Sequence, residues 1–156
     1  MMIIDNNGNR GFTLVEMLVT IAVMAILLGI TIATWNRYRL NTDLKTAART
    51  VVSDFSMAKQ MAVRNAIGYR ITFNTGTNSY QLIETATGNP IQTRNMSEFG
   101  PGIVLSNPNF GGNTTISFFA RGTAEAGSVV VTNSINSTGT ITVNMTGRTY
   151  VRFNLQ

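Results

Sequence analysis

The sequence contains no cysteine and no histidine, and these two absences exclude several classes of function. Without cysteine, the chain has no disulfide framework and no thiolate to act as a nucleophile or metal ligand. Without histidine, it lacks the commonest general base and metal ligand of proteins. The 7 acidic residues are scattered, and no pair of them has the spacing of a metal site or of an acid/base pair. We therefore predict that the chain is not an enzyme and that it holds no metal and no cofactor.

Charge is also missing from one long stretch near the start of the chain. No ionisable side chain lies between Glu16 and Arg37. An apolar stretch of about 20 residues is long enough to cross a bilayer as a helix. We therefore predict that residues 12–35 form a transmembrane helix. The alternatives are a secretory signal peptide, which has a shorter apolar core, and a plain membrane anchor. A plain anchor does not explain Glu16, because an unpaired charge at that depth is costly.

Proline is scarce, and the first of the 3 prolines is Pro90. No proline therefore kinks or breaks a helix before that point. Beyond the predicted membrane segment, apolar residues recur at spacings of three and four, which indicates an amphipathic helix. We predict that this helix continues through residues 36–67, that its apolar stripe packs on a sheet of the same chain, and that Asn65 or Gly68 ends it. The charged residues of the segment, including Asp54, are expected to lie mostly off the stripe. The stripe consists of Leu40, Leu44, Ala47, Val51, Phe55, Ala58 and Ala62.

After Gly68 the apolar residues alternate with polar ones, which indicates β-strands. Residues 69–74 and 80–85, joined by a turn, are predicted to form a hairpin. Further short strands are predicted at 103–105, 115–120, 129–133, 139–145 and 149–153, and loops at 87–90, 100–102 and 107–113. The predicted fold class is therefore α+β. A long N-terminal helix, transmembrane in its first half, packs against an antiparallel β-sheet head formed by residues 68–156.

The stretch from Gly11 through Phe12 and Thr13 to Glu16 resembles the leader junction of type IV pilins and type II secretion pseudopilins. The resemblance implies that residues 1–11 are a leader peptide, which a prepilin peptidase removes between Gly11 and Phe12. It also implies that Phe12 is then N-methylated, and that Glu16 pairs with the terminal amine of a neighbouring subunit. A carboxylate in an apolar bundle is disfavoured alone and tolerated when paired, so the pair favours one register of subunits over others.

The C-terminal half resembles the GspH/FimT-like group of minor pilins and pseudopilins, on the strength of Phe118–Ala124, Val129–Val131 and Thr146–Arg148. The resemblance implies a minor subunit of a type IV pilus that assists assembly. The alternative is a structural tip subunit of the type II secretion pseudopilus. The implied partners are other pilin or pseudopilin subunits, the prepilin peptidase and the inner membrane. Before assembly the chain is expected to cross the inner membrane once, with its head in the periplasm.

A basic row near the C-terminus is a candidate binding site. In an extended strand, Arg148, Tyr150 and Arg152 lie on one face, because alternate residues point the same way. Arginine binds phosphate, and a tyrosine between two arginines can stack on a base. Some FimT-like pilins bind DNA through a C-terminal segment of glycine and two arginines, which Gly147, Arg148 and Arg152 resemble here. The row therefore predicts contact with double-stranded DNA, and the alternative is an ordinary solvated sheet face.

Overall fold

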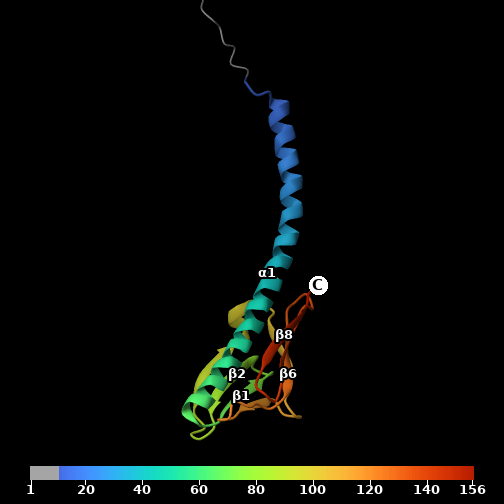
Figure 1. Ribbon diagram of the computed structural model, residues 1–156. Helices are drawn as coiled ribbons and strands as arrows, with labels where there is room; N and C mark the ends of the chain where they lie inside the picture. The colour runs from blue at the N-terminus through green and yellow to red at the C-terminus, as the bar shows by residue number, and fades with distance from the viewer. Residues whose placement is uncertain (1–10) are drawn as a thin grey trace, which may run out of the picture. The chain divides into compact units, whose positions relative to one another are not determined.

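The computed structural model describes residues 11–156, and at residues 30–34 it describes the backbone alone. Apart from residue 11, the leader that we predict lies outside the described residues. The described chain contains one long helix followed by a head of short strands (Figure 1). Its elements are α1 (Leu14–Asn65), β1 (Tyr69–Asn74), β2 (Ser79–Glu84), β3 (Pro90–Asn95), the short 3-10 helix η1 (Met96–Phe99), β4 (Val104–Asn109), β5 (Thr115–Phe118), β6 (Gly127–Thr132), β7 (Thr138–Val143) and β8 (Thr149–Asn154).

The chain divides into two compact units, one ending at Asn36 and the other comprising Arg37–Gln156. Helix α1 contributes to both. In the first unit the side chains of residues 11–29 are all exposed, although most of them are apolar. Within the described residues, no helical stretch combines the length and the apolarity that a membrane crossing requires. The transmembrane assignment of residues 12–35 stays a prediction.

The second half of α1 supplies one wall of the core of the head, as its apolar stripe predicts. From Leu44 to Ala62 every residue of the stripe is fully buried, whereas Leu40 is only half-buried. Ala48 is buried as well, although the stripe did not include it. The helix ends at Asn65, one of the two predicted positions, and the next residue, Ala66, has a positive φ of 56°.

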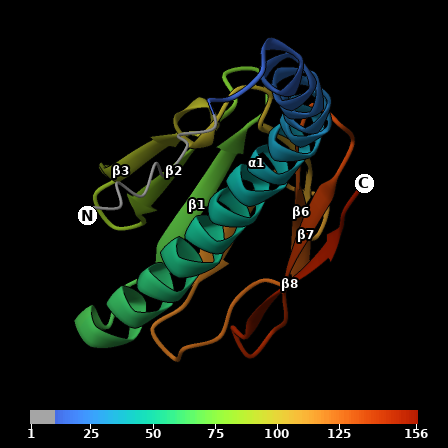
Figure 2. The ribbon, with the colours of Figure 1, turned by 90° about the horizontal axis from the view of Figure 1, so that it is seen from above.

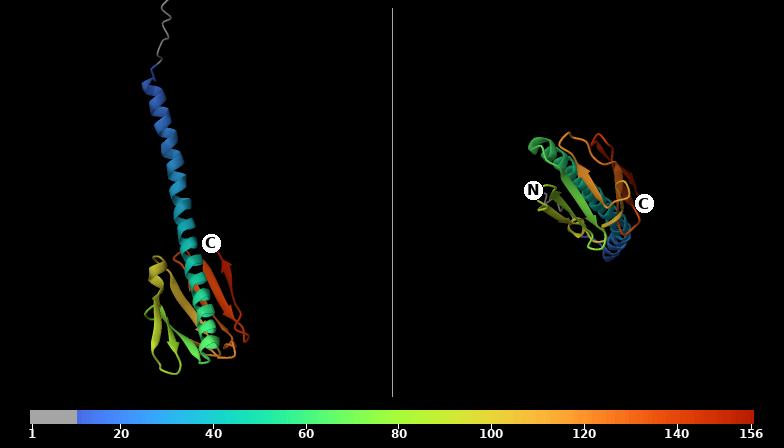
Figure 3. Two further views of the ribbon diagram at one scale, coloured as in Figure 1. Left: turned by 60° about the vertical axis from the view of Figure 1, so that its left-hand side comes forward. Right: turned by 90° about the horizontal axis from the view of Figure 1, so that it is seen from below.

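The strands form two antiparallel sheets, with the order β3-β2-β1-β5 in one and β4-β6-β7-β8 in the other. The second half of α1 lies across both sheets, and in the view of Figure 2 strands β1 and β2 are seen on one side of it and β6, β7 and β8 on the other; Figure 3 gives two further views. Phe55 of α1 marks the centre of the shared core. Its ring centroid lies 6.0 Å from that of Phe73, 6.3 Å from that of Phe110 and 5.8 Å from that of Phe118. The Phe55 ring therefore contacts the first sheet through Phe73 and Phe118, and the segment that follows β4 of the second sheet through Phe110.

Two segments differ from the predicted strands and loops. Strand β3 was not predicted, because it is an edge strand whose two faces are largely exposed and so shows no apolar alternation. Its first residue is Pro90, which an edge strand tolerates at that position. Strand β4 extends to Asn109, into the predicted loop at 107–113. The extension contains a bulge after Ser106, where Asn107 adopts a φ of 47°.

Candidate functional site

The predicted processing junction leads directly into the first turn of α1. Thr13 precedes the helix, and Glu16 lies in its first turn. The Glu16 Oε2 atom accepts hydrogen bonds from the backbone N–H of Thr13 at 2.9 Å and from its hydroxyl at 3.0 Å. In return, the Thr13 Oγ1 atom accepts from the backbone N–H of Glu16 at 3.3 Å. This reciprocal arrangement is a capping box. It was not predicted, although the Thr-x-x-Glu pattern before an apolar run is its recognised signal.

The first half of α1 presents apolar side chains to its surroundings on all sides. Leu18 is 62% exposed, and the residues before and after it are exposed to a similar degree. A helix that is apolar all round is normally buried in protein or lipid. Within the described residues, no other part of the chain covers this surface.

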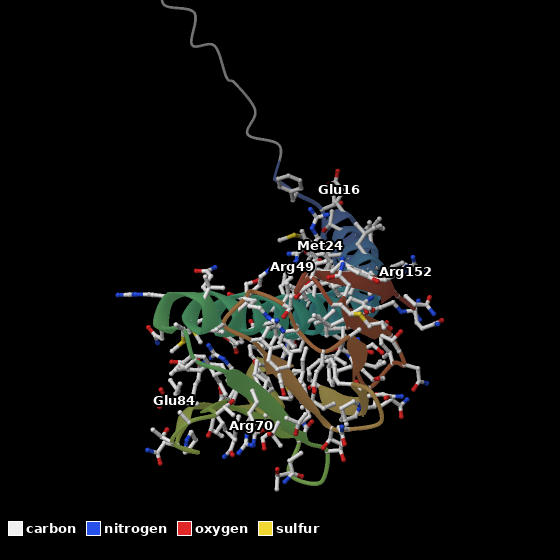
Figure 4. All side chains as sticks on the ribbon, turned by 60° about the horizontal axis from the view of Figure 1, so that its bottom comes forward. Glu16, Met24, Arg49, Arg70, Glu84 and Arg152 are labelled. Atoms are coloured by element: carbon white, nitrogen blue, oxygen red, sulfur yellow. The ribbon has the colours of Figure 1, made fainter. Side chains whose placement is uncertain are left out.

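The three residues of the predicted basic row are all exposed. Strand β8 is an edge strand, and Tyr150 and Arg152 point away from the core on one face of it. Figure 4 shows the Arg152 side chain on the outside of the head. On the other face, Val151 and Phe153 pack against the core, which confirms the predicted alternation. Arg148 lies one residue before the strand, where its backbone N–H donates to the side-chain oxygen of Asn144 at 2.9 Å.

Two of the three C-terminal segments that resemble minor pilins, Phe118–Ala124 and Thr146–Arg148, meet each other in space. A Cβ atom on Gly147, whose φ is 69°, would lie 2.8 Å from the carbonyl oxygen of Gly122 and 3.0 Å from Cδ of Lys59. The ammonium group of Lys59 donates to the carbonyl oxygen of Thr146 at 2.9 Å. Glycine is therefore required at 147 for two reasons, a left-handed backbone and close contact on both sides. The turn at 119–123 and the β7–β8 hairpin thus pack together on the last turns of α1.

A buried polar cluster links α1 to the first sheet, and sequence reasoning placed its central residue wrongly. Asp54 was expected off the apolar stripe, yet it is only 5% exposed. Its Oδ2 atom accepts from the hydroxyl of Tyr80 at 2.6 Å and from Nε of Arg94 at 2.8 Å. Burial and the bond to Asp54 raise the pKa of Tyr80 above its ordinary value, so its hydroxyl stays a donor. Both partners come from strands far along the chain, which is why no local pattern revealed the cluster.

These features define a class of protein. A motif at the chain start, a long N-terminal helix and a small head of two antiparallel sheets are the parts of a pilin-like subunit. The family model described as the prokaryotic N-terminal methylation motif matches residues 6–32. The chain belongs to the family described as type II transport protein GspH, whose model matches residues 47–147. It is therefore a minor pilin-like or pseudopilin-like structural subunit of a type IV pilus or a type II secretion system.

Solved structures share the fold. The minor pseudopilin EpsH from the type 2 secretion system of Vibrio cholerae has a TM-score of 0.57 at 10% identity, over 72% of this chain and 97% of EpsH. The type IV minor pilin FimU of Pseudomonas aeruginosa has a TM-score of 0.59 at 14% identity, over 72% of this chain and 90% of FimU. A second crystal form of FimU gives 0.55 at 14% identity, over 70% and 92% of the two chains. No curated protein shows significant sequence similarity to this chain.

Proposed function

We propose that this chain is a minor subunit of a type IV pilus, that it is processed between Gly11 and Phe12, and that it assists assembly of the filament. The observation that carries the proposal is the contrast along α1. Residues 12–28 expose apolar side chains on every side, whereas the second half of the helix buries its apolar stripe in the head of its own chain. A bilayer before assembly, and the helices of neighbouring subunits afterwards, supply the burial that the first half lacks. The head then lies on the periplasmic side of the inner membrane.

Glu16 sets the register of assembly in this proposal. Removal of the leader creates a positively charged amine at Phe12, the nearest cation that a neighbouring subunit offers. One carboxylate oxygen of Glu16 already accepts two hydrogen bonds from Thr13, which fixes the side chain at the start of the helix. The other oxygen, for which no hydrogen bond occurs among the described residues, then accepts from the neighbour's amine. A buried charge is tolerated when it is paired in this way.

The test separates the charge of Glu16 from its capping role. In Glu16→Gln the side chain retains a capping oxygen, because glutamine also serves in a capping box, but it has no charge to pair with an amine. We expect Glu16→Gln to be processed normally and to lose most of its incorporation into filaments. This is measured by the intact mass of membrane-extracted protein and by immunoblots of sheared filaments. Thr13→Ser, which keeps the cap and the charge, is the matched control.

Two results would contradict this proposal. One is incorporation of Glu16→Gln at the wild-type level, because the charge would then have no role. The other is a wild-type chain that retains its leader in a cell with an active prepilin peptidase. Deletion of the gene distinguishes the proposed pilus subunit from the alternative function, a structural tip subunit of the secretion pseudopilus. Loss of surface pili with normal export of secreted enzymes supports the pilus, and the reverse supports the pseudopilus.

A second candidate function is DNA binding during uptake. The observation that favours it is the exposure of Arg148, Tyr150 and Arg152 together at the edge strand β8 and its preceding turn. Because only two arginines engage phosphates, we expect weak binding, with log K falling against log of the salt concentration at a slope of only about −2. In mobility-shift assays with full-length protein in non-ionic detergent, Arg148→Ala combined with Arg152→Ala should abolish the shift. Unchanged binding by this variant, or no binding by the wild type at low salt, would remove the hypothesis.

A further inference from the structure

Four basic residues belong to chain segments that meet at the pole of the head where α1 ends. Lys59 and Arg64 belong to the last turns of the helix, Arg121 to the turn at 119–123, and Arg148 to the β7–β8 hairpin. The contact between Gly122 and Gly147 brings the two loops together, and Lys59 touches both glycine positions. We call Lys59, Arg64, Arg121 and Arg148 the basic cluster.

The basic cluster carries positive charge that its own chain does not neutralise. Arg64, Arg121 and Arg148 are exposed, and Lys59 is half-buried with its ammonium group on a neutral carbonyl oxygen. The ion pairs of the described residues lie elsewhere, between Arg39 and Asp43 and between Arg94 and Asp54. Like charges held together without counter-charges repel each other, so an acidic partner would be attracted to this pole.

An apolar pocket opens beside the basic cluster. It has a volume of about 470 Å³, and Phe110, Ala124, Ala126 and Met145 contribute its apolar walls. Glu125 also lines it, and one oxygen of its carboxylate accepts from the backbone N–H of Ser117 at 2.9 Å. The loops that carry Arg121 and Arg148 also form this pocket, since Ala124 and Met145 follow and precede those arginines by three residues. The backbone N–H of Ala124 donates to the carbonyl oxygen of Met145 at 3.1 Å, which holds the two walls together. Met145 is 73% exposed, an unusual position for a large apolar side chain without a partner.

We propose that this pole of the head is a docking site for a protein segment in which one apolar side chain is followed by acidic residues. The apolar side chain fills the pocket and covers Met145, and the carboxylates lie against the basic cluster. Burial of an apolar anchor surrounded by charge pairs is the usual composition of a protein interface. The proposal goes beyond incorporation into a filament, because it concerns what the head binds, and it holds for a pilus or a pseudopilus alike.

A protein partner fits this pole better than a nucleic acid does. Bases bind to proteins by stacking on exposed aromatic rings, but the aromatic ring in this pocket, Phe110, is only 1% exposed. Phe119, in the turn that carries Arg121, is 41% exposed but does not line the pocket. The other apolar walls are alanine and methionine, which suit an aliphatic side chain. The exposed tyrosine of the DNA hypothesis, Tyr150, lies on β8 and does not line the pocket. The two sites share Arg148, so the test relies on residues that they do not share.

The test measures peptide binding to full-length protein in non-ionic detergent by fluorescence anisotropy. The probe is a fluorescein-labelled peptide with one leucine followed by a run of aspartates. Two matched peptides replace either the leucine by serine or the aspartates by asparagines. We expect the leucine–aspartate peptide to bind, and each replacement to weaken binding about tenfold, because the anchor and the charges both contribute. These comparisons use the wild-type protein, so they do not depend on the folding of a variant.

Variants then locate the site. Arg121→Glu should weaken binding of the peptide about tenfold, and Met145→Gln about threefold or more. Arg152→Glu makes the same charge change on an exposed residue outside the pole, and we expect it to leave peptide binding within about twofold of wild type. Labelled duplex DNA is measured in parallel. If DNA binding is genuine, it should respond to Arg152→Glu and not to Met145→Gln.

Three outcomes would overturn the proposal. The first is no binding of the leucine–aspartate peptide at low salt. The second is binding that is insensitive to the leucine or to Met145→Gln, which would indicate simple charge attraction. The third is tighter binding of duplex DNA that Arg121→Glu abolishes, which would make the pole a nucleic-acid site. None of these outcomes bears on the role of Glu16, so this proposal can fail while the proposed function stands.

Discussion

The two units of this chain differ in where their apolar side chains go. In the first unit the residues around Leu18 are exposed on every side of the helix. In the second unit the same helix buries Leu44, Val51 and Phe55 completely against the two sheets. An isolated helix is only marginally stable in water, and most of the stability of a helix in a protein comes from packing of its apolar face. The head therefore carries its stability within its own chain, whereas the described side chains of the first unit gain no such packing.

The largest effect that tests this comparison is expected from Phe55→Ala. This substitution removes the ring that contacts Phe73, Phe110 and Phe118 at the centre of the core. We expect it to lower the free energy of unfolding of the head by about 3–5 kcal/mol. The measurement is urea denaturation of the full chain in non-ionic detergent, followed by circular dichroism. Leu18→Ala, in the first unit, should leave this free energy unchanged. A similar loss from both substitutions would show that the two units are not separate in stability.

A smaller effect is expected from Asn133→Ala, at the end of the head that lies near the unit boundary. The buried Asn133 amide donates to the carbonyl oxygen of Leu40 at 3.1 Å. Its oxygen accepts from the backbone N–H groups of Ile135 at 3.2 Å and Ser137 at 2.9 Å. Alanine removes the acceptor of the Ile135 and Ser137 N–H groups, which should cost about 1–3 kcal/mol of stability.

Hydrogen exchange locates this effect. The amides of Ile135 and Ser137 should exchange faster in Asn133→Ala than in the wild type. Asn89→Ala, the same change at an exposed loop position, should alter neither the exchange nor the stability. If Asn133→Ala also left both unchanged, the contact between the β6–β7 loop and α1 would contribute nothing to holding the helix on the head.

The buried hydroxyl of Tyr80 should make the stability of the head depend on pH. Its pKa is raised in the folded state by burial and by the bond to Asp54. A group with a raised folded-state pKa contributes its full stabilisation below its unfolded pKa, about 10 for tyrosine, and loses it as the pH rises further. We therefore expect the free energy of unfolding to fall above about pH 10, by at most about 1.4 kcal/mol per pH unit from this group.

Tyr80→Phe removes this dependence together with one hydrogen bond. At neutral pH it should cost about 1 kcal/mol, and its stability should decline less steeply in alkali than that of the wild type. Tyr150→Phe, on an exposed face, should follow the wild-type curve. Parallel curves for Tyr80→Phe and the wild type would contradict a coupling between ionisation of Tyr80 and folding.

The sequence predicts features that depend on residues close together in the chain, and it misses features that depend on residues far apart. The length of α1, the buried stripe through Phe55 and the alternation of β8 follow from local periodicity and from the absence of early prolines. Asp54 could not be assigned to the core, because its partners Tyr80 and Arg94 come from two strands that follow much later. Strand β3 was missed because both of its faces are largely exposed, so no apolar pattern marks it.

The candidate sites divide in the same way. Gly11, Phe12 and Glu16 form one contiguous motif, so a reader of the sequence finds them together, and only the capping bond to Thr13 was overlooked. The exposure of Tyr150 and Arg152 follows from alternation along a single strand. The basic cluster has no such signal. Its members come from the helix, a turn and a hairpin, and only the packing of those three segments places them at one pole.

The smallest effect is expected at the boundary itself. Nε of Arg39 lies 3.8 Å from Oδ2 of Asp43, one helical turn further along α1. The Arg39 side chain is 60% exposed and that of Asp43 is 23% exposed, so water and salt screen the pair. Arg39→Gln should therefore cost no more than about 0.5 kcal/mol, and the difference from wild type should disappear at high salt. The same urea titration at low and high salt measures it, with Arg49→Gln as a control on an exposed arginine that has no acidic partner among the described residues. A loss of more than about 1 kcal/mol at high salt would mean that the first turn of the helix beyond Asn36 is held by more than this ion pair.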